Sequence, residues 1–239
     1  MLISFKQNKA TSMARIKIVN ENFYFQNLSN FLTNISLCKK KYFEEKNQNR
    51  YNSTLLFEAM FYHKINCLDK AIQTYEILST RYHDSNDLNN YGICQHNIGS
   101  LYSERKEFKL AINHYENAIQ HLHENDTFFE LAWCYYQNGN KKNCKKSLNL
   151  GLKTDTQYTA YTLLIKWLLI MLDSPNSKRS LNILLKIEKE YFDTLGPNAQ
   201  KLLYIAISNY YTSVKNFQKS NEYLKKLSTN FVNSIIDIN

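Results

Sequence analysis

The most constraining feature of the sequence is a spaced pattern of large and small side chains near its middle. An apolar residue and a glycine are followed at fixed offsets by an aromatic residue, an alanine, a second aromatic residue and a second alanine. These positions are Ile98, Gly99, Tyr102, Ala111, Tyr115 and Ala118. Small side chains let two helices cross closely, and the aromatic rings fill the space beside the crossing. The pattern therefore predicts a helix-turn-helix unit whose second helix packs against the next unit at Ala118.

The same spacing can be followed along the chain in five copies. The matching residues of the other four copies are Ala59, Tyr62, Ala71, Tyr75 and Leu78; Leu131, Ala132, Tyr135, Cys144, Leu148 and Gly151; Trp167, Leu168, Met171, Ser180, Leu184 and Ile187; and Ile207, Ser208, Tyr211, Ser220, Leu224 and Leu227. The position of Ala111 holds a small residue in every copy, and the copies lie 40, 33, 36 and 40 residues apart. Units of this length that repeat along a chain stack into a solenoid.

The pattern resembles the signature of the tetratricopeptide repeat (TPR), and the resemblance covers about residues 52–230. It implies an all-α fold, a right-handed TPR solenoid of about five helix-turn-helix repeats with an N-terminal capping helix. In such a solenoid the first helix of each repeat lines a concave groove. The resemblance predicts the fold specifically, but it leaves the function open, because one fold carries many functions.

Ahead of the first copy, apolar residues recur at helical spacing between Phe25 and Tyr42. We expect residues 20–50 to form an N-terminal helical segment, either a cap or a degraded repeat, and residues 1–19 to be a tail or linker. The solenoid is expected over residues 51–232 and a C-terminal tail over residues 233–239. Asp126 or Thr127 is expected to be the N-cap of the helix that opens the third repeat.

The composition agrees with a helical protein that neither enters a membrane nor depends on disulfides. The chain holds only five glycines and two prolines, fewer than turn-rich β folds need. Its longest apolar stretch, Leu163 to Leu172, contains Lys166 and is too short to span a bilayer. Five scattered cysteines without a Cys-x-x-Cys pair fit a reducing compartment, so we expect a cytoplasmic protein.

The net charge of +9 could indicate nucleic-acid binding, but the charge is distributed in blocks. Residues 1–50 carry +6, residues 51–130 carry −5, residues 131–200 carry +5 and residues 201–239 carry +3. Lysine clusters on helices are more often solvated faces than binding surfaces. Direct binding of RNA or DNA by the solenoid is therefore a hypothesis that ranks behind peptide sensing and behind a scaffold for protein partners.

The sequence gives no support to catalysis, a metal site or a cofactor. His114, His121 and His123 share one expected helix, but no carboxylate stands at the spacing that would complete a helical zinc site. No phosphate-binding glycine loop and no Gly-x-Ser-x-Gly motif occur, and Cys144 takes the place of a repeat alanine. We therefore expect no enzyme, no metal and no cofactor.

The expected concave groove supplies the candidate binding residues. Trp133 and Tyr136 are one helical turn apart and could hold an apolar side chain of a peptide, although Trp133 could equally pack against the neighbouring repeat. The side-chain amides of Gln137 and Asn209 can donate to and accept from a peptide backbone. The candidate peptide-binding residues are Asn97, Ser100, Phe129, Trp133, Tyr136, Gln137, Lys166, Asn209 and Thr212.

Irregular repeats rich in tyrosine and asparagine behind an N-terminal helix also resemble the C-terminal region of bacterial peptide-pheromone receptors, the PlcR-like, NprR-like and Rap-like regulators. This resemblance implies a short signalling peptide held in the groove by asparagine side chains, with Asn209 as the best-matched position and Asn97 as the second. Receptors of the first two kinds contact DNA through a helix-turn-helix domain, and residues 1–50 are too short and unpatterned to hold one. A homodimer is possible. The alternative is a scaffold that bridges folded protein partners without a signalling peptide.

Overall fold

The structure is a computed structural model that describes residues 28–154 and 159–236 of the chain. Within these ranges the chain forms eleven α helices and one short 3-10 helix, and no strand. They are α2 (Leu28–Glu44), α3 (Gln48–Lys64), α4 (Leu68–Asp84), α5 (Leu88–Glu104), α6 (Phe108–Ala118), α7 (Asn125–Gln137), α8 (Lys141–Thr154), α9 (Ala160–Asp173), α10 (Lys178–Tyr191), η1 (Phe192–Thr194), α11 (Pro197–Ser213) and α12 (Phe217–Ile236). The expected tail over residues 1–19 and the last three residues of the expected C-terminal tail lie outside the described residues.

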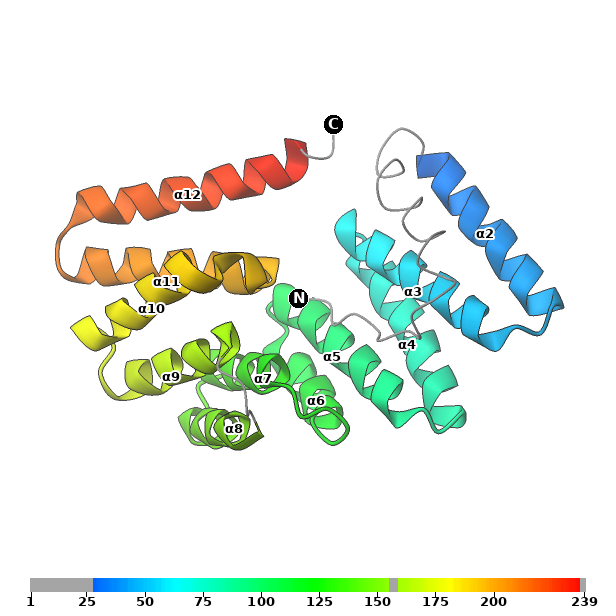
Figure 1. Ribbon diagram of the computed structural model, residues 1–239, viewed down its shortest axis with the longest axis horizontal. Helices are drawn as coiled ribbons and strands as arrows, with labels where there is room; N and C mark the ends of the chain where they lie inside the picture. Colours follow the sequence, from blue (N-terminus) through cyan, green and yellow to red (C-terminus); the bar gives the residue numbers. More distant parts are fainter. Residues whose placement is uncertain (1–27, 155–158, 237–239) are drawn as a thin grey trace.

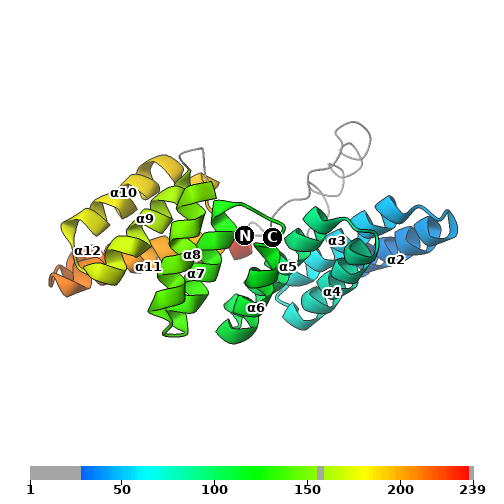
Figure 2. The ribbon, with the colours of Figure 1, turned by 90° about the horizontal axis from the view of Figure 1, so that it is seen from below.

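The helices form five consecutive pairs that coincide with the five copies of the sequence pattern. These pairs are α3 with α4, α5 with α6, α7 with α8, α9 with α10, and α11 with α12. Each helix packs mainly against the helix before it and the helix after it in the chain. Figure 1 shows the pairs along an open arc that runs from α2 to α12. In the view from below (Figure 2), α2 to α8 follow one another along the long axis, and α9 to α12 overlap at the end opposite α2. The fold is a TPR-like solenoid, as the sequence predicted.

The first half of the arc has a more regular period than the sequence pattern alone indicates. Helices α2 to α5 each contain 17 residues, and each is joined to the next helix by a three-residue turn. The middle residue of each turn has a left-handed backbone, and these residues are Lys46, Asn66, Asn86 and Lys106. A left-handed residue just after a helix ends that helix sharply and lets the chain reverse. The period of 20 residues explains why the first two copies are 40 residues apart.

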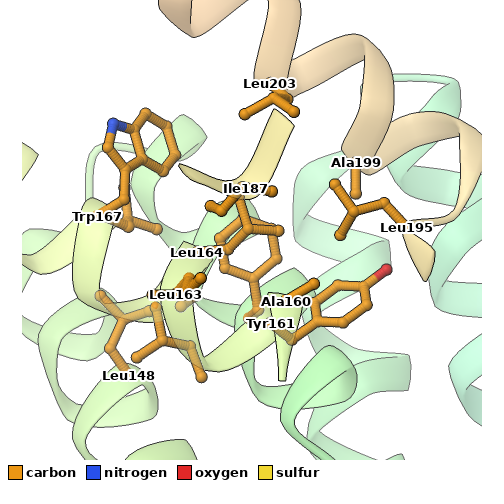
Figure 3. Close-up of a cluster of buried hydrophobic side chains, with 14 of the residues drawn as sticks. Leu148, Ala160, Tyr161, Leu163, Leu164, Trp167, Ile187, Leu195, Ala199 and Leu203 are labelled. Atoms are coloured by element: carbon orange, nitrogen blue, oxygen red, sulfur yellow. The ribbon is translucent and has the colours of Figure 1, made fainter. Parts of the chain in front are cut away.

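The small residues of the pattern are buried where two helices cross. The residues at the position of Ala111 are all enclosed, namely Ala71, Cys144, Ser180 and Ser220. A Cβ atom added to Gly99 would stand 3.1 Å from the ring of Tyr115, so α5 and α6 could not cross as closely with a larger residue there. The largest core cluster runs from α6 to α11, and Figure 3 shows part of it, where Leu148, Leu164, Trp167, Ile187 and Leu203 converge from α8, α9, α10 and α11.

The expected N-cap of the third repeat was wrong, because both candidates lie two or three residues after the observed one. Helix α7 begins at Asn125, and its N-cap is Glu124 rather than Asp126 or Thr127. Asp126 still binds the helix terminus, because its Oδ1 accepts a hydrogen bond of 2.7 Å from the Thr127 amide. Asp126 therefore lies inside the first turn of α7, where its side chain joins the same helix face as later residues of that helix.

Candidate functional site

The first helices of the second, third and fourth repeats, α5, α7 and α9, lie next to one another. Helix α7 contacts both α5 and α9, in addition to the contacts that each makes with its own second helix. In a solenoid of this kind the first helices line the inner face of the arc. Most of the residues that the sequence singled out lie on these three helices, with α11 carrying the others.

Three aromatic rings form a group between α7 and α9. The rings of Trp133 and Tyr136 stack with their centroids 5.4 Å apart, and Trp167 of α9 lies 6.4 Å from Trp133. Trp133 and Tyr136 are half-buried, whereas Trp167 is buried in the core. Trp133 thus packs against the neighbouring repeat and still presents part of its ring to the surroundings. Gln137 follows at the end of α7 and is exposed.

Three of the candidate residues lie in the interior instead of on the surface. Asn97 and Phe129 have no exposed surface, and Ser100 is almost fully enclosed. Phe129 packs edge-on against Tyr161 of α9, with the ring centroids 6.0 Å apart. These side chains lie in the protein interior beneath the surface of α5 and α7, and each would have to move to contact a ligand.

The remaining candidates do not join the aromatic group. Lys166 is half-buried on α9. Asn209 and Thr212 are on α11, which packs mainly against α10 and α12 rather than against α7. The Thr212 hydroxyl hydrogen-bonds to the Ser208 carbonyl oxygen at 3.1 Å and to Ser220 Oγ at 2.8 Å. Thr212 therefore links α11 to α12, and Asn209 is exposed beside it.

Buried polar side chains connect α5, α7 and α9. His96 Nδ1 and Thr127 Oγ1 are 3.0 Å apart and join α5 to α7. Asn125 Nδ2 donates to Thr162 Oγ1 at 3.1 Å and joins α7 to α9. Hydrogen bonds between buried groups are directional, so these contacts fix the orientation of the three helices more narrowly than apolar packing would.

Two carboxylates, Asp126 and Glu130, lie on this part of α7. Their exposed fractions are only 8% and 9%. Within the described ranges no hydrogen bond and no ion pair reaches Glu130, whereas Asp126 accepts from Thr127. Burial raises the pKa of Glu130 to about 7, and the neighbouring charges of Asp126 and Glu104 act in the same direction. Burial also raises the pKa of Asp126, against the hydrogen bonds from Thr127.

A third carboxylate, Glu104, joins helices that are far apart in the sequence. Its Oε1 accepts from His63 Nε2 of α3 at 2.8 Å and from Asn198 Nδ2 of α11 at 2.9 Å. We call His63, Glu104 and Asn198 the clasp. Burial alone would raise the pKa of Glu104, but the hydrogen bonds from His63 and Asn198 and the charge of His63 hold the pKa below its usual value. The clasp connects the first, second and fifth repeats.

The sequence prediction did not include Asp126, Glu130 or the clasp among the binding residues. Glu130 follows Asp126 by one helical turn and precedes Trp133 by three residues, so these three share a face of α7. That spacing could have indicated the acidic pair. No spacing in the sequence could have indicated the clasp, because its three residues lie in three separate repeats.

The described residues offer little to a catalytic mechanism. Burial raises the pKa of the Cys134 and Cys144 thiols to about 12 and about 11, so both stay protonated at neutral pH and are poor nucleophiles. In the same ranges no three histidine, cysteine or acidic side chains are grouped so that they could hold a metal ion. No helix among the described residues is both long and apolar enough to cross a bilayer.

Comparison with protein families identifies the repeats directly. The model of the tetratricopeptide repeat matches residues 94–120 and 126–158, which correspond to the second and third repeats. Among curated proteins, none matches the sequence. The third repeat, which this model matches, carries the acidic pair and two of the three rings of the aromatic group.

Several solved structures have the same fold at low sequence identity. The Rap conjugation gene regulator of plasmid pLS20, in complex with the Phr* peptide, aligns with a TM-score of 0.63 and 17% identity over 85% of this chain and 56% of its own. The quorum sensor NprR of B. thuringiensis, in its apo form, aligns with a TM-score of 0.60 and 16% identity over 82% of this chain and 58% of its own.

A tetratricopeptide repeat protein from Parabacteroides merdae aligns with a TM-score of 0.58 and 15% identity, over 91% of this chain and 80% of its own. The chain spans little more than half the length of the Rap and NprR structures. At these identities the likeness concerns the fold. The chain thus contains tetratricopeptide repeats and folds as a TPR solenoid.

Proposed function

We propose that this chain binds a short peptide along α5, α7 and α9, on the inner face of the arc. The observation that supports the proposal most directly is the half-buried stack of Trp133 and Tyr136 beside the acidic pair of the same helix. Aromatic rings that are partly exposed bind apolar side chains, and adjacent polar groups fix the orientation of a peptide. Gln137 adds an amide that can pair with a peptide backbone.

The solenoid also provides a way to transmit the binding event. Its repeats contact mainly their neighbours, so a ligand that spans two repeats can change the angle between them. We infer that the protein is the peptide-sensing part of a bacterial quorum-sensing-type transcriptional regulator in the cytoplasm. The shared fold supports this assignment, since one similar structure contains a Phr* peptide and another is a quorum sensor. In this proposal DNA is contacted only through a helix-turn-helix domain outside the chain.

Native mass spectrometry of the protein purified from its own cells tests the proposal. We expect a co-retained short peptide that is lost when Trp133 is replaced by alanine. The Phe217→Ala variant is the matched control, because Phe217 is an exposed aromatic residue of α12, away from the inner face of the arc. Thermal melting of both variants separates loss of the peptide from loss of the fold. A wild-type protein that takes up no peptide from a spent-medium extract would contradict the proposal.

A second candidate function is a scaffold that bridges folded protein partners. It is favoured by an exposed group of lysines on α8, namely Lys141, Lys142, Lys145 and Lys146. This basic surface belongs to the second helix of its repeat, which lies away from the inner face, and it suits an acidic partner surface. Co-purification of a stable folded partner that resists Trp133→Ala but is lost when the α8 lysines are replaced would favour the scaffold.

A further inference from the structure

The fifth repeat lacks a contact that each of the four earlier repeats makes. In those repeats the second helix packs against the first helix of the next repeat, as α4 does against α5 and α10 does against α11. Helix α12 is the second helix of the fifth repeat and lies at one end of the arc (Figure 1). Among the described helices, none other than α11 makes an extended contact with α12. The stacking surface of the last repeat is therefore open.

Leu224 of α12 shows the difference at a single position of the repeat pattern. The residues at its position in the earlier repeats are all buried, namely Tyr75, Tyr115, Leu148 and Leu184. Leu148, for example, meets the side chains of α9, the first helix of the next repeat, in the core cluster (Figure 3). In contrast, Leu224 is 47% exposed. A side chain that belongs to the core in four repeats thus lies on the surface in the fifth.

Ile205 of α11 repeats this observation on the first helix of the same repeat. The residues at its position in the earlier repeats are also buried, namely Leu56, His96, Phe129 and Ile165. Two of them contact the next repeat directly, since His96 Nδ1 lies 3.0 Å from Thr127 Oγ1 and the ring of Phe129 packs edge-on against Tyr161. Ile205 is 41% exposed. Both helices of the last repeat therefore leave uncovered the position that a following first helix covers elsewhere.

The open surface continues along α12 as a stripe without charge. Phe217, Asn221, Leu224 and Ser228 follow one another at intervals of four, three and four residues, so they share one face of the helix. All four are exposed, and Phe217 is 60% exposed. The terminal repeat of a solenoid normally needs a polar outer face. An apolar stripe at this place indicates a surface that another helix covers.

The charge around the stripe decides between possible occupants. Residues 197–228 contain five lysines and one glutamate, a net charge of +4. Lys201 precedes Ile205 by one helical turn and Lys225 follows Asn221 by one turn, so both lysines border the open surface. A second copy of the chain would bring the same positive charge to this surface and would be repelled. A partner with carboxylates beside its apolar contact residues is complementary to it.

We propose that the end face, formed by Ile205, Phe217, Asn221, Leu224 and Ser228, binds an amphipathic α helix of a partner protein whose apolar stripe is bordered by aspartate and glutamate. The partner helix takes the place that the first helix of a sixth repeat would take. Amphipathic helices bind apolar surfaces through side chains spaced three and four residues apart. The end face is separate from the inner face of α5, α7 and α9, so this inference does not depend on the proposed peptide binding.

Three designed helices test the end face without knowledge of the natural partner. The first is a stapled 18-residue peptide with a leucine stripe bordered by glutamates, the second has lysines in place of the glutamates, and the third has the composition of the first with its leucines spread around the helix. We expect the full-length protein to bind the first about tenfold or more tightly than the other two in fluorescence anisotropy at low salt. The Ile205→Ser and Leu224→Ser variants should lose this binding.

The matched control is Ile77→Ser, which removes an equally exposed apolar side chain from the second helix of the first repeat. It should bind the first peptide as the wild type does, and so should Trp133→Ala, whose substitution lies on the inner face. The Lys201→Glu/Lys225→Glu variant keeps the apolar residues and should lose the preference for glutamate over lysine. Circular dichroism and thermal melting check that each variant is folded.

Equal binding of the glutamate and lysine helices by the wild type would overturn the proposal, and so would equal binding of the striped and spread helices. A protein that binds none of the three would overturn it as well. Light scattering after size exclusion addresses the remaining occupant. A wild-type dimer that Leu224→Ser converts to a monomer would show that a second copy of the chain covers the end face, contrary to the proposal.

Discussion

At the scale of single residues, the energetic consequence of burying Glu130 depends on pH. The carboxyl group of an unfolded chain has a pKa of about 4.3, whereas the folded pKa of Glu130 is about 7. The folded state therefore binds more protons than the unfolded state between these values, and its stability falls as the pH rises through that window. Below about pH 4 both states are protonated and Glu130 has no such cost.

Replacement of Glu130 by glutamine should stabilise the unliganded protein at pH 8 and leave it nearly unchanged near pH 4. We expect a gain of roughly 2 kcal/mol at the higher pH, because glutamine has the same shape and carries no charge. Urea unfolding at the two pH values measures the effect, with Glu222→Gln as the exposed control. An equal change at both pH values would show that Glu130 is not held in an unpaired, buried state.

The cysteines give a second prediction at this scale. Cys38 and Cys67 are half-buried, whereas Cys94, Cys134 and Cys144 are enclosed, and burial raises the pKa of each enclosed thiol. The thiolate is the reactive form of cysteine. Brief alkylation of the native protein at neutral pH should therefore label Cys38 and Cys67, and unfolding should expose the other three. Peptide mapping by mass spectrometry identifies the sites, and rapid native labelling of Cys134 would contradict the packing around α7.

At the scale of the helices, α8 approaches α7 and α9 so closely at Gly151 that no side-chain atom can be added there. Gly151 of α8 takes the position of Ala118 in the repeat pattern. A Cβ atom there would stand 2.9 Å from Phe128 Cβ, an atom fixed to the backbone of α7, and 2.9 Å from Ile165 Cδ1 of α9. An alanine must therefore push α8 away from both helices.

The Gly151→Ala variant should lose about 1–3 kcal/mol of unfolding free energy, although alanine favours a helix more than glycine does. The Asn149→Ala variant, exposed on the same helix, isolates the effect of helix propensity and should be neutral or slightly stabilising. Thermal and urea unfolding of the two variants make the comparison. A stabilised Gly151→Ala protein would mean that α8 can move at little cost.

The helices and their pairing could be predicted because the packing that creates them is local. A small side chain is needed at each point where two consecutive helices cross, and Ala71, Ala111 and Cys144 meet this need. These crossings recur at a nearly constant spacing, so the sequence alone shows them. The burial of Phe129 and Asn97 could not be predicted in this way. Their enclosure depends on how closely α5, α7 and α9 approach one another, and the spacing within one helix does not set that distance.

At the scale of the whole molecule, the clasp is the feature that sequence spacing could not indicate. Glu104 and Asn198 are 94 residues apart and meet because the arc brings the start of α11 to the end of α5. A solenoid held only by neighbouring repeats would be free to bend between them. The clasp therefore limits the range of curvature of the arc, and a peptide on the inner face would bind to a shape that the clasp helps to set.

Removal of the Asn198 amide should loosen this closure without unfolding the helices. In the Asn198→Ala variant we expect about 1–2 kcal/mol less stability, because a hydrogen bond to a largely buried carboxylate is lost. The radius of gyration from small-angle X-ray scattering should increase while the far-ultraviolet circular dichroism stays the same. The Asn182→Ala variant, exposed on α10, is the control and should match the wild type in both measurements.

Acid should have the same effect as this substitution, because the clasp needs an ionised Glu104. The folded pKa of Glu104 is held below its usual value, so its contribution to stability is complete above the unfolded pKa of about 4.3 and is lost as the pH falls through the folded value. The wild type should therefore expand below about pH 4, and the Asn198→Ala variant should expand less, since it starts from the looser state. A wild-type radius that stays constant to the onset of acid unfolding would mean that the packing of neighbouring repeats alone sets the curvature.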